Sequence, residues 1–377
     1  MSARVVALGD IIRVQYGKAL KAEDRDETGS FPVYGANGLV GHHSSRIVNH
    51  TTLIIGRKGS VGAVTYAPEG GWPIDTAFYV EAIQPNDIDW RYLYYALINA
   101  DLQRHVISTS IPGLNRNDIY RKQIPLPPLP DQRRIAAILD AADALRAKRR
   151  AALAKLDALG RAVFLEMFGE VGRNTKGWRT AKLSTCFAKD REGTKCGPFG
   201  SALKREEYVD RGIPVWTMDN IQGFGFIPET ALFITEDKYN QLSAYKAVTG
   251  DIIISRAGTV GKMCVVDTEE SRAIISTNLI RLSLNEQVLD PYYFISLMQI
   301  AEGKLGRLQT GSDGAYTFMN TGILRELTIP IPAINKQREY RRCWIKRREE
   351  TFLMSESLKG IETLLRSLHA LVFHNPL

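Results

Sequence analysis

Two short segments combine an arginine with glycines directly after an apolar run typical of a strand. They are Arg57-Lys58-Gly59-Ser60 and Arg256-Ala257-Gly258-Thr259. Glycine permits a tight turn with exposed N–H groups, and arginine donates hydrogen bonds to phosphates and base edges. One such segment alone favours a hairpin with a structural salt bridge, but its presence in both halves makes a polyanion site an equal alternative. The candidates are Arg57, Lys58, Ser60, Arg256 and Thr259.

Further cations lie in segments that could contact phosphate. The run from Cys196 to Arg205 is rich in glycine and ends in Lys204 and Arg205, although a solvated turn would have the same composition. Lys18 follows Tyr16-Gly17, and Arg46 follows His42-His43-Ser44-Ser45. We therefore add Lys18, Arg46, Lys204 and Arg205 to the candidate DNA-binding residues.

The common signatures of catalysis are missing from the sequence. Ala257 to Met263 fails as a P-loop, because the first glycine is missing and Met263 replaces the required Ser or Thr. No H-E-x-x-H, C-x-x-C, N-P-P-Y or D-P-P-Y sequence occurs. We therefore expect no catalytic residue, no metal ligand and no cofactor in this chain.

Composition sets further bounds on size, compartment and partner. The chain has 377 residues and a formal net charge of +8, so it is long enough for two or three domains and suited to a polyanion such as nucleic acid. Its start has no apolar signal segment, and no stretch is apolar for long enough to span a bilayer. Four scattered cysteines fit a reducing compartment, so we expect a cytoplasmic protein.

A proline-rich boundary followed by a long helical pattern occurs twice. Pro125, Pro127, Pro128 and Pro130 exclude a helix or central strand, and a proline-free stretch rich in Ala, Leu and Arg begins at Asp131, which suits an N-cap. Its apolar residues predict a heptad seam at Ile135, Ile138, Ala142, Leu145, Ala152, Leu156, Leu159 and Val163. The sequence Ile124 to Arg133 recurs as Ile329 to Arg338. The second helix has a convincing seam only from Met354 through Ile361, Leu364 and Leu368.

The segments before the two helices also repeat one another. Phe31 to Tyr34 matches Ile213 to Trp216, and Asp89-x-x-Tyr92 matches Asp290-x-x-Tyr293. We predict mixed α/β domains at 1–130 and 173–332, with long helices at 131–172 and 333–377. Loops that differ on a shared scaffold suit two binding modules with different targets.

These features resemble the specificity subunits of type I restriction-modification systems over essentially the whole chain. The doubled boundaries carry the resemblance, together with Leu8-Gly9-Asp10 and Gly197-Pro198-Phe199-Gly200-Ser201. It implies two target recognition domains, in a mixed α/β fold, separated by two long antiparallel helices that form a coiled coil. It further implies binding of double-stranded DNA at a bipartite, asymmetric sequence, with the helices as a spacer.

The resemblance also implies two modification (methyltransferase) subunits as partners, which carry S-adenosylmethionine. It leaves open whether restriction subunits that use ATP join the complex. Apolar residues near the helix ends would need cover on a bare two-helix rod, so we expect partner docking at Phe164, Met167, Phe168, Leu368 and Leu371. Two other classes stay open: a stand-alone DNA-acting enzyme, and a non-catalytic scaffold that binds acidic proteins.

Overall fold

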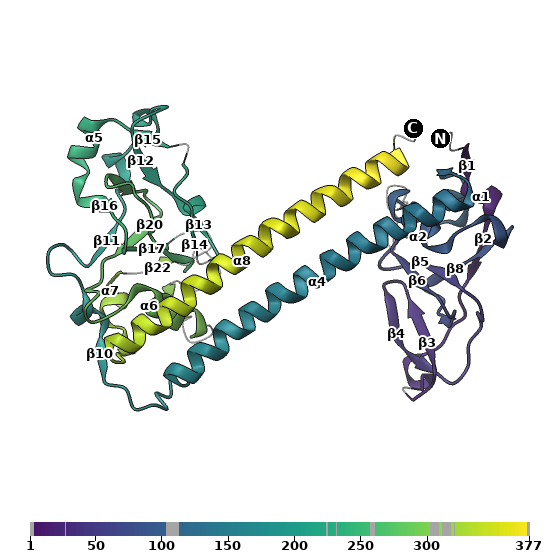
Figure 1. Cartoon of the computed structure of the whole chain (residues 1–377), viewed down its shortest axis with the longest axis horizontal. Helices are drawn as coiled ribbons and strands as arrows, with labels where there is room; N and C mark the ends of the chain where they lie inside the picture. Colours follow the sequence, from purple (N-terminus) through teal and green to yellow (C-terminus); the bar gives the residue numbers. More distant parts are fainter. Residues whose placement is uncertain are drawn as a thin grey trace. The chain divides into compact units, whose positions relative to one another are not determined.

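The chain forms two compact units that are not consecutive in sequence. The computed structural model describes residues 4–26, 28–102, 113–223, 225–230, 232–256, 261–301, 309–310, 318–319 and 321–374. One unit is Met1–Ala151 with Ser355–Leu377, and the other is Ala152–Met354. The long helices α4 (Leu129–Phe168) and α8 (Ile334–His369) contribute to both units (Figure 1). We expected four consecutive segments, and the division differs because both helices are shared.

The α/β domain of the first unit contains a four-stranded antiparallel sheet in the order β2-β8-β5-β6. These strands are β2 (Ile12–Tyr16), β5 (Thr52–Gly56), β6 (Val64–Ala67) and β8 (Ala77–Ala82). In a smaller sheet, β3 (Phe31–Gly35) pairs antiparallel with β4 (Gly38–His43) and parallel with β7 (Trp72–Pro73). β1 (Arg4–Ala7) pairs with β9 (Gln123–Leu126), and the helices are α1 (Leu8–Ile11), α2 (Trp90–Asn99) and α3 (Arg116–Tyr120).

The α/β domain of the second unit repeats this topology. Its main sheet has the order β11-β20-β17-β18, formed by β11 (Thr194–Cys196), β17 (Ile252–Ser255), β18 (Met263–Val265) and β20 (Leu279–Leu282). In the smaller sheet, β12 (Ile213–Trp216) is parallel to β19 (Ala273–Ile275), with β15 (Phe233–Ile234) and β16 (Lys246–Ala247) at its edges. β10 (Thr180–Lys182) pairs with β23 (Thr328–Pro330) as β1 pairs with β9. The predicted internal repeat is confirmed.

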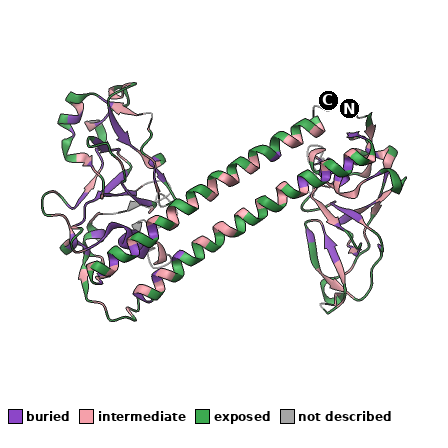
Figure 2. Ribbon diagram, in the orientation of Figure 1, coloured by how far each residue is buried: buried purple, intermediate pink, exposed green. Residues whose placement is uncertain are grey.

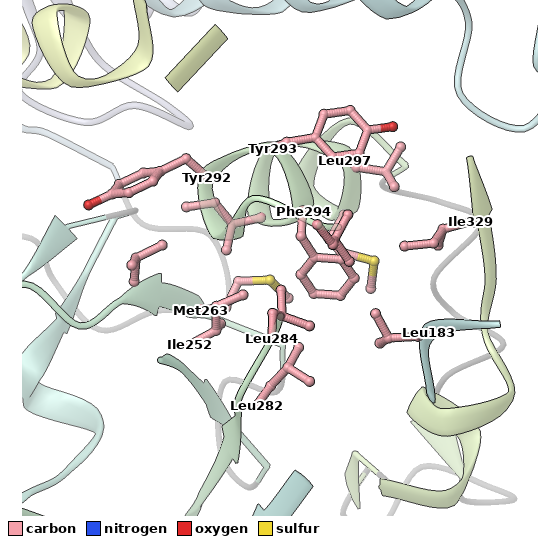
Figure 3. Packing of buried hydrophobic residues seen from close by; sticks show 14 of the residues in the cluster. Leu183, Ile252, Met263, Leu282, Leu284, Tyr292, Tyr293, Phe294, Leu297 and Ile329 are labelled. Carbon is pink, nitrogen blue, oxygen red and sulfur yellow. The ribbon is translucent and has the colours of Figure 1, made fainter. Parts of the chain in front are cut away.

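The remaining elements of the second unit lie in its loops or cover its sheets. The helices are α5 (Glu236–Gln241), α6 (Pro291–Ile300) and α7 (Thr321–Glu326). Two short hairpins pair β13 (Ile221–Gln222) with β14 (Gly225–Phe226) and β21 (Gln309–Thr310) with β22 (Phe318–Met319). Figure 3 shows Phe294 of α6 lying among Met263, Leu284 and Leu183 in the core. Burial of this apolar surface holds α6 against the main sheet.

A buried glutamine joins each α/β domain to the long helix that follows it. Gln132, 1% exposed, accepts a hydrogen bond from the Asp89 N–H (2.9 Å) and donates to the carbonyls of Asp87 (3.0 Å) and Pro127 (2.9 Å). Gln337, 0% exposed, accepts from the Asp290 N–H (2.8 Å) and donates to Val288 (3.1 Å) and Pro332 (2.7 Å). Each amide thus satisfies three backbone groups at one junction. The recurring glutamine of the proline-rich boundary is therefore structural.

The first unit has a second attachment between α2 and α4. Arg91 Nε donates to Asp140 Oδ1 (2.9 Å), and the Tyr95 hydroxyl donates to the same oxygen (2.7 Å). Burial opposes ionisation of Asp140, yet these hydrogen bonds hold the pKa of its carboxyl below the ordinary value. The carboxylate is therefore charged at neutral pH and ties the two helices together.

α4 and α8 pack antiparallel within each unit. Leu139 and Leu365 share an apolar cluster in the first unit, and Phe164 contacts Tyr340 in the second, with ring centroids 5.4 Å apart. Figure 2 shows that most helix positions away from the domains are exposed or intermediate. The less exposed positions of α4 recur at heptad spacing, at Leu139, Ala142, Arg146, Arg149, Leu153, Leu156, Gly160, Val163 and Met167.

The predicted heptad seam of α4 is wrong at three positions. Ile138 is 49% exposed, Leu145 is 44% exposed and Leu159 is 56% exposed. Arginine and glycine occupy part of the true seam, and a Cβ on Gly160 would overlap the guanidinium of Arg347. A search for apolar periodicity passes over such positions because it counts neither residue type.

The interpretation of α8 also needs correction at its beginning. Its less exposed positions recur from Gln337 through Tyr340, Trp344, Arg347, Thr351, Met354, Leu358, Ile361, Leu365 and Leu368. Tyr340 and Trp344 are 3% and 2% exposed, so the seam does not begin only at Met354. Leu364, assigned to the seam, is 54% exposed, and the adjacent Leu365 is buried in its place.

Three residues predicted to dock partner subunits instead belong to the core of the second unit. Phe164 is 0% exposed, Phe168 is 4% exposed, and Met167 packs against the same cluster. The ring of Phe164 stacks on Tyr293 of α6, with centroids 5.6 Å apart. The prediction failed because the end of α4 is covered by α6 and by the start of α8 of the same chain. Leu368 is also partly buried, whereas Leu371 is 48% exposed.

We predict that Phe164→Ala destabilises the protein by about 3–5 kcal/mol, because it removes a buried ring and leaves a cavity. Leu159→Ala is the matched control, since Leu159 lies on the same helix but is 56% exposed. The control should change stability by no more than about 0.5 kcal/mol. Urea unfolding monitored by circular dichroism gives both values. Equal effects of the two substitutions would refute the assignment of Phe164 to the core.

We also predict a pH-dependent cost for Gln337→Glu. The new carboxylate would lose both N–H donors and face the carbonyl oxygens of Val288 and Pro332, which raises its folded-state pKa above the unfolded value of about 4.3. Its folded state then binds more protons, so stability falls as pH rises above about 4.3. The deficit relative to wild type should reach about 3 kcal/mol at pH 8 and shrink at pH 5.

The control for this experiment is Gln241→Glu, which adds the same charge at an exposed position of α5. It should change stability little at either pH. Paired urea titrations of the three proteins at pH 5 and pH 8 provide the comparison. A Gln337→Glu deficit that does not grow with pH would contradict the buried amide.

No helix in the described part of the chain is both long and apolar enough to cross a membrane.

Candidate nucleic-acid interface

The topology brings the ends of two strands to one edge of the main sheet in the first unit. β2 and β5 both pair antiparallel with β8, so their carboxyl ends meet where β8 begins. The Gly17 N–H donates to the Ala77 carbonyl (3.1 Å), and the Arg57 N–H donates to the Thr76 carbonyl (2.9 Å). The segments Tyr16 to Lys18 and Arg57 to Ser60 therefore lie next to each other.

Arg57 lies over an exposed aromatic ring at this edge. Its guanidinium carbon is 4.9 Å from the ring centroid of Tyr16, which is 49% exposed, and Nη1 donates to the Asp75 carbonyl (3.1 Å). Among the described residues, no carboxylate forms an ion pair with Arg57. This favours a binding role over the structural salt bridge that the sequence left open.

The second unit has the same arrangement at the matching edge. The Gly197 N–H donates to the Leu279 carbonyl and the Arg256 N–H to the Asn278 carbonyl, both at 2.9 Å. The guanidinium carbon of Arg256 lies 4.5 Å from the ring centroid of Phe199, which is 53% exposed. Each domain thus holds an arginine against an exposed aromatic ring beside the end of its main sheet.

A further arginine at this site in the first unit was not among the candidate DNA-binding residues. The guanidinium carbon of Arg116, the first residue of α3, lies 4.5 Å from the ring centroid of Tyr16. Asn115 caps α3 by accepting a hydrogen bond from the Asn117 N–H (3.0 Å), and this fixes the helix start at Arg116. Asn115 is a local sequence signal for the start of α3 at Arg116. It does not reveal that the ring of Tyr16, from a distant part of the chain, lies beside Arg116.

The other predicted residues are spread over several surfaces. Lys58 and Ser60 are exposed beside Arg57, and Lys18 is exposed with its ammonium 5.9 Å from the ring centroid of Trp72. Arg46 instead packs over Phe31 and donates to the Glu69 carbonyl (3.0 Å). Lys204 and Arg205 are exposed near the 3₁₀ turn Arg205–Glu207, which follows Phe199 in sequence. Thr259 lies outside the described residues.

These side chains suit the binding of a polyanion. Arginine and lysine donate hydrogen bonds to phosphate, and an aromatic face beside them can also contact a base or a sugar. No group of three or more His, Cys, Asp or Glu residues within the described ranges could hold a metal ion. The fixed cations and rings of this arrangement are suited to binding and orienting a polyanion.

Comparison with known proteins gives a family for this arrangement. The model described as "Type I restriction modification DNA specificity domain" matches residues 3–155 and 194–341. The first segment contains the first α/β domain and most of the first long helix, and the second contains the second α/β domain from β11 onward. The chain belongs to this family of type I restriction-modification DNA specificity proteins, as its sequence resemblance indicated.

Relatives and solved structures agree with this assignment. A type I restriction enzyme MjaVIII specificity subunit from Methanocaldococcus jannaschii is 24% identical, over 96% of this chain and 86% of the relative. The EcoprrI specificity subunit from Escherichia coli is 27% identical over 37% of this chain and 35% of its own.

The fold is also that of a type I restriction-modification S subunit from M. genitalium. The TM-score is 0.67 at 16% identity, covering 99% of this chain and 96% of that one. A chain from a structural study of assembly and conformational transition in the type I system has a TM-score of 0.51 at 19% identity, covering 97% and 96% of the two chains. The mixed α/β fold with two related domains and long helices is therefore confirmed.

We predict that Gly17→Ala damages the candidate interface through the backbone. A Cβ at Gly17 would overlap the carbonyl oxygens of Pro73 and Ile74, so the segment would have to move away from the end of β7. We expect a loss of about 2–3 kcal/mol in the free energy of unfolding. Gly59→Ala is the control, because Gly59 has φ +78° and no atom within 4 Å of a Cβ, so it carries only a conformational cost of about 1 kcal/mol. A larger effect at Gly59 would contradict the close approach at Gly17.

Proposed function

We propose that this chain is the specificity subunit of a type I restriction-modification complex and binds double-stranded DNA at a bipartite, asymmetric sequence. Each α/β domain contacts one half of the target, and the long helices set the unread gap between the halves. The chain supplies recognition and assembly, without catalytic residues of its own. S-adenosylmethionine and ATP belong to partner subunits, and the complex acts in the cytoplasm.

The observation that carries this proposal is the duplicated pair of an arginine and an exposed aromatic ring. Arg57 with Tyr16 in the first domain and Arg256 with Phe199 in the second lie at matching edges of the two main sheets. Two related domains with different surrounding loops suit two different short sequences joined in one target. The net charge of +8 favours a polyanion as the common ligand.

Docking of two modification subunits has support from the outer faces of the long helices. Exposed apolar side chains remain there in both units, and their burial by a partner would be favourable. In place of the buried Phe164, Met167 and Phe168, we propose that the docking surfaces include Ile138, Leu145, Leu159, Phe352, Leu353, Leu364 and Leu371, all between 44% and 67% exposed. Restriction subunits would join an assembly of this kind in systems that also cleave DNA.

The test is selection of DNA from a random duplex pool by the full chain co-expressed with its modification subunits. We expect sequencing of the retained DNA to give two short conserved blocks separated by a gap of fixed length. Retention without a motif would favour a scaffold for polyanions, and methyl transfer by the isolated chain would establish a stand-alone enzyme. Either outcome would overturn the proposal.

A further inference from the structure

The arginines at the sheet edge occupy equivalent positions in the two domains. In the first domain Gly56 pairs with Ala77, and in the second Ser255 pairs with Leu279, so Arg57 and Arg256 each follow the matching strand residue. Both N–H groups donate at 2.9 Å to the carbonyl of the residue just before that partner. The fold therefore places both arginines in the same way.

The aromatic rings beside these arginines come from different positions. Tyr16 precedes Gly17, whereas Phe199 follows Gly197 by two residues, although Gly17 and Gly197 make equivalent hydrogen bonds. The loops thus differ, yet each presents a half-exposed ring to its arginine. An arginine common to two domains with different targets cannot distinguish between those targets. It suits contact with the phosphates, which are the same in every sequence.

Arg116 lacks this symmetry. The Leu8 N–H donates to the Lys122 carbonyl, and the Leu183 N–H donates to the Leu327 carbonyl, which aligns α3 with α7. Arg116 lies six residues before Lys122, and Thr321, the first residue of α7, lies six residues before Leu327. Thr321 is therefore the equivalent of Arg116 in the second domain. At this aligned position, therefore, only the first domain carries an arginine.

Two guanidinium groups on one ring make a concentrated positive site. Both carbons lie within 5 Å of the Tyr16 centroid, at 4.9 Å for Arg57 and 4.5 Å for Arg116. In the described part of the chain neither side chain forms an ion pair, and Arg116 donates only a long hydrogen bond to the Val14 carbonyl (3.4 Å). An electron-rich group such as a phosphate or the O6 and N7 edge of guanine would relieve their mutual repulsion.

We propose, on the basis of the function proposed above, that Arg57 and Arg256 contact DNA phosphates whatever the sequence, whereas Arg116 reads a guanine in the half-site of the first domain. Tyr16 holds Arg57 and Arg116 together through its ring. Arginine donating to O6 and N7 is the commonest specific contact to guanine. Specificity then comes from Arg116, which the second domain replaces with Thr321. The neighbouring phosphate-binding arginine is present in both domains.

The experiment repeats the duplex selection with Arg57→Ala and Arg116→Ala chains, each co-expressed with the modification subunits. Arg57→Ala should weaken binding by about tenfold for all sequences, reduce the salt dependence by about one phosphate contact and leave the motif unchanged. Arg116→Ala should remove the preference for one G·C pair, by roughly tenfold or more, in one half-site only. Arg121→Ala is the control, since the Arg121 side chain is 80% exposed at the other end of α3.

The Arg116→Lys variant tests whether the effect of Arg116→Ala comes only from lost charge or from misfolding. It retains the cation but cannot form the two parallel hydrogen bonds, so overall affinity should persist while the guanine preference falls. A motif unchanged in both Arg116 variants, or altered by Arg57→Ala, would overturn the inference while leaving the proposed function intact. Absence of any motif with the unaltered chain would overturn both.

Discussion

The glutamine at the start of each long helix is the contact on which the architecture depends. One amide group, fully enclosed, bonds to the backbone of the preceding domain and to the proline-rich turn. Because its donors and acceptor are all used, rotation of the domain about the helix start would leave polar groups buried without partners. The glutamine therefore fixes each long helix at its start, and the Arg91–Asp140 contact in the first unit and the buried Tyr340 and Trp344 in the second add further attachments.

Much of the fold could be predicted from the sequence because duplication made weak signals visible twice. In the repeated Asp-x-x-Tyr motif the aspartate caps the helix. The tyrosine hydroxyl donates to a proline carbonyl in the strand before the long helix, as Tyr92 does to Pro125 of β9 (2.6 Å). The helix seams were harder to predict from the sequence, because an arginine and a glycine form part of them: Arg347 packs into the space left by Gly160. Nor could the sequence reveal that Phe164 meets Tyr293, because that contact depends on the tertiary fold.

The candidate interface was predictable only in part for the same reason. Arg57 and Arg256 were found because the strand-arginine-glycine pattern is local and occurs twice. Tyr16 and Arg116 come together from segments about a hundred residues apart, and no local pattern records their proximity. A constant backbone scaffold with rings supplied from different loop positions lets the loops diverge while each arginine keeps its support.

The last described turns of the chain complete the core of the first domain. Val372 and Phe373 pack against its apolar cluster, with the Phe373 ring centroid 5.6 Å from that of Tyr92, and His369 bonds to Asn99 (3.0 Å). During synthesis on the ribosome, the first domain must therefore wait for residues that are made only after the second domain. Until then its α2 face stays uncovered, so a nascent chain that stalls or is cut short before them offers chaperones and proteases an apolar surface in its first domain.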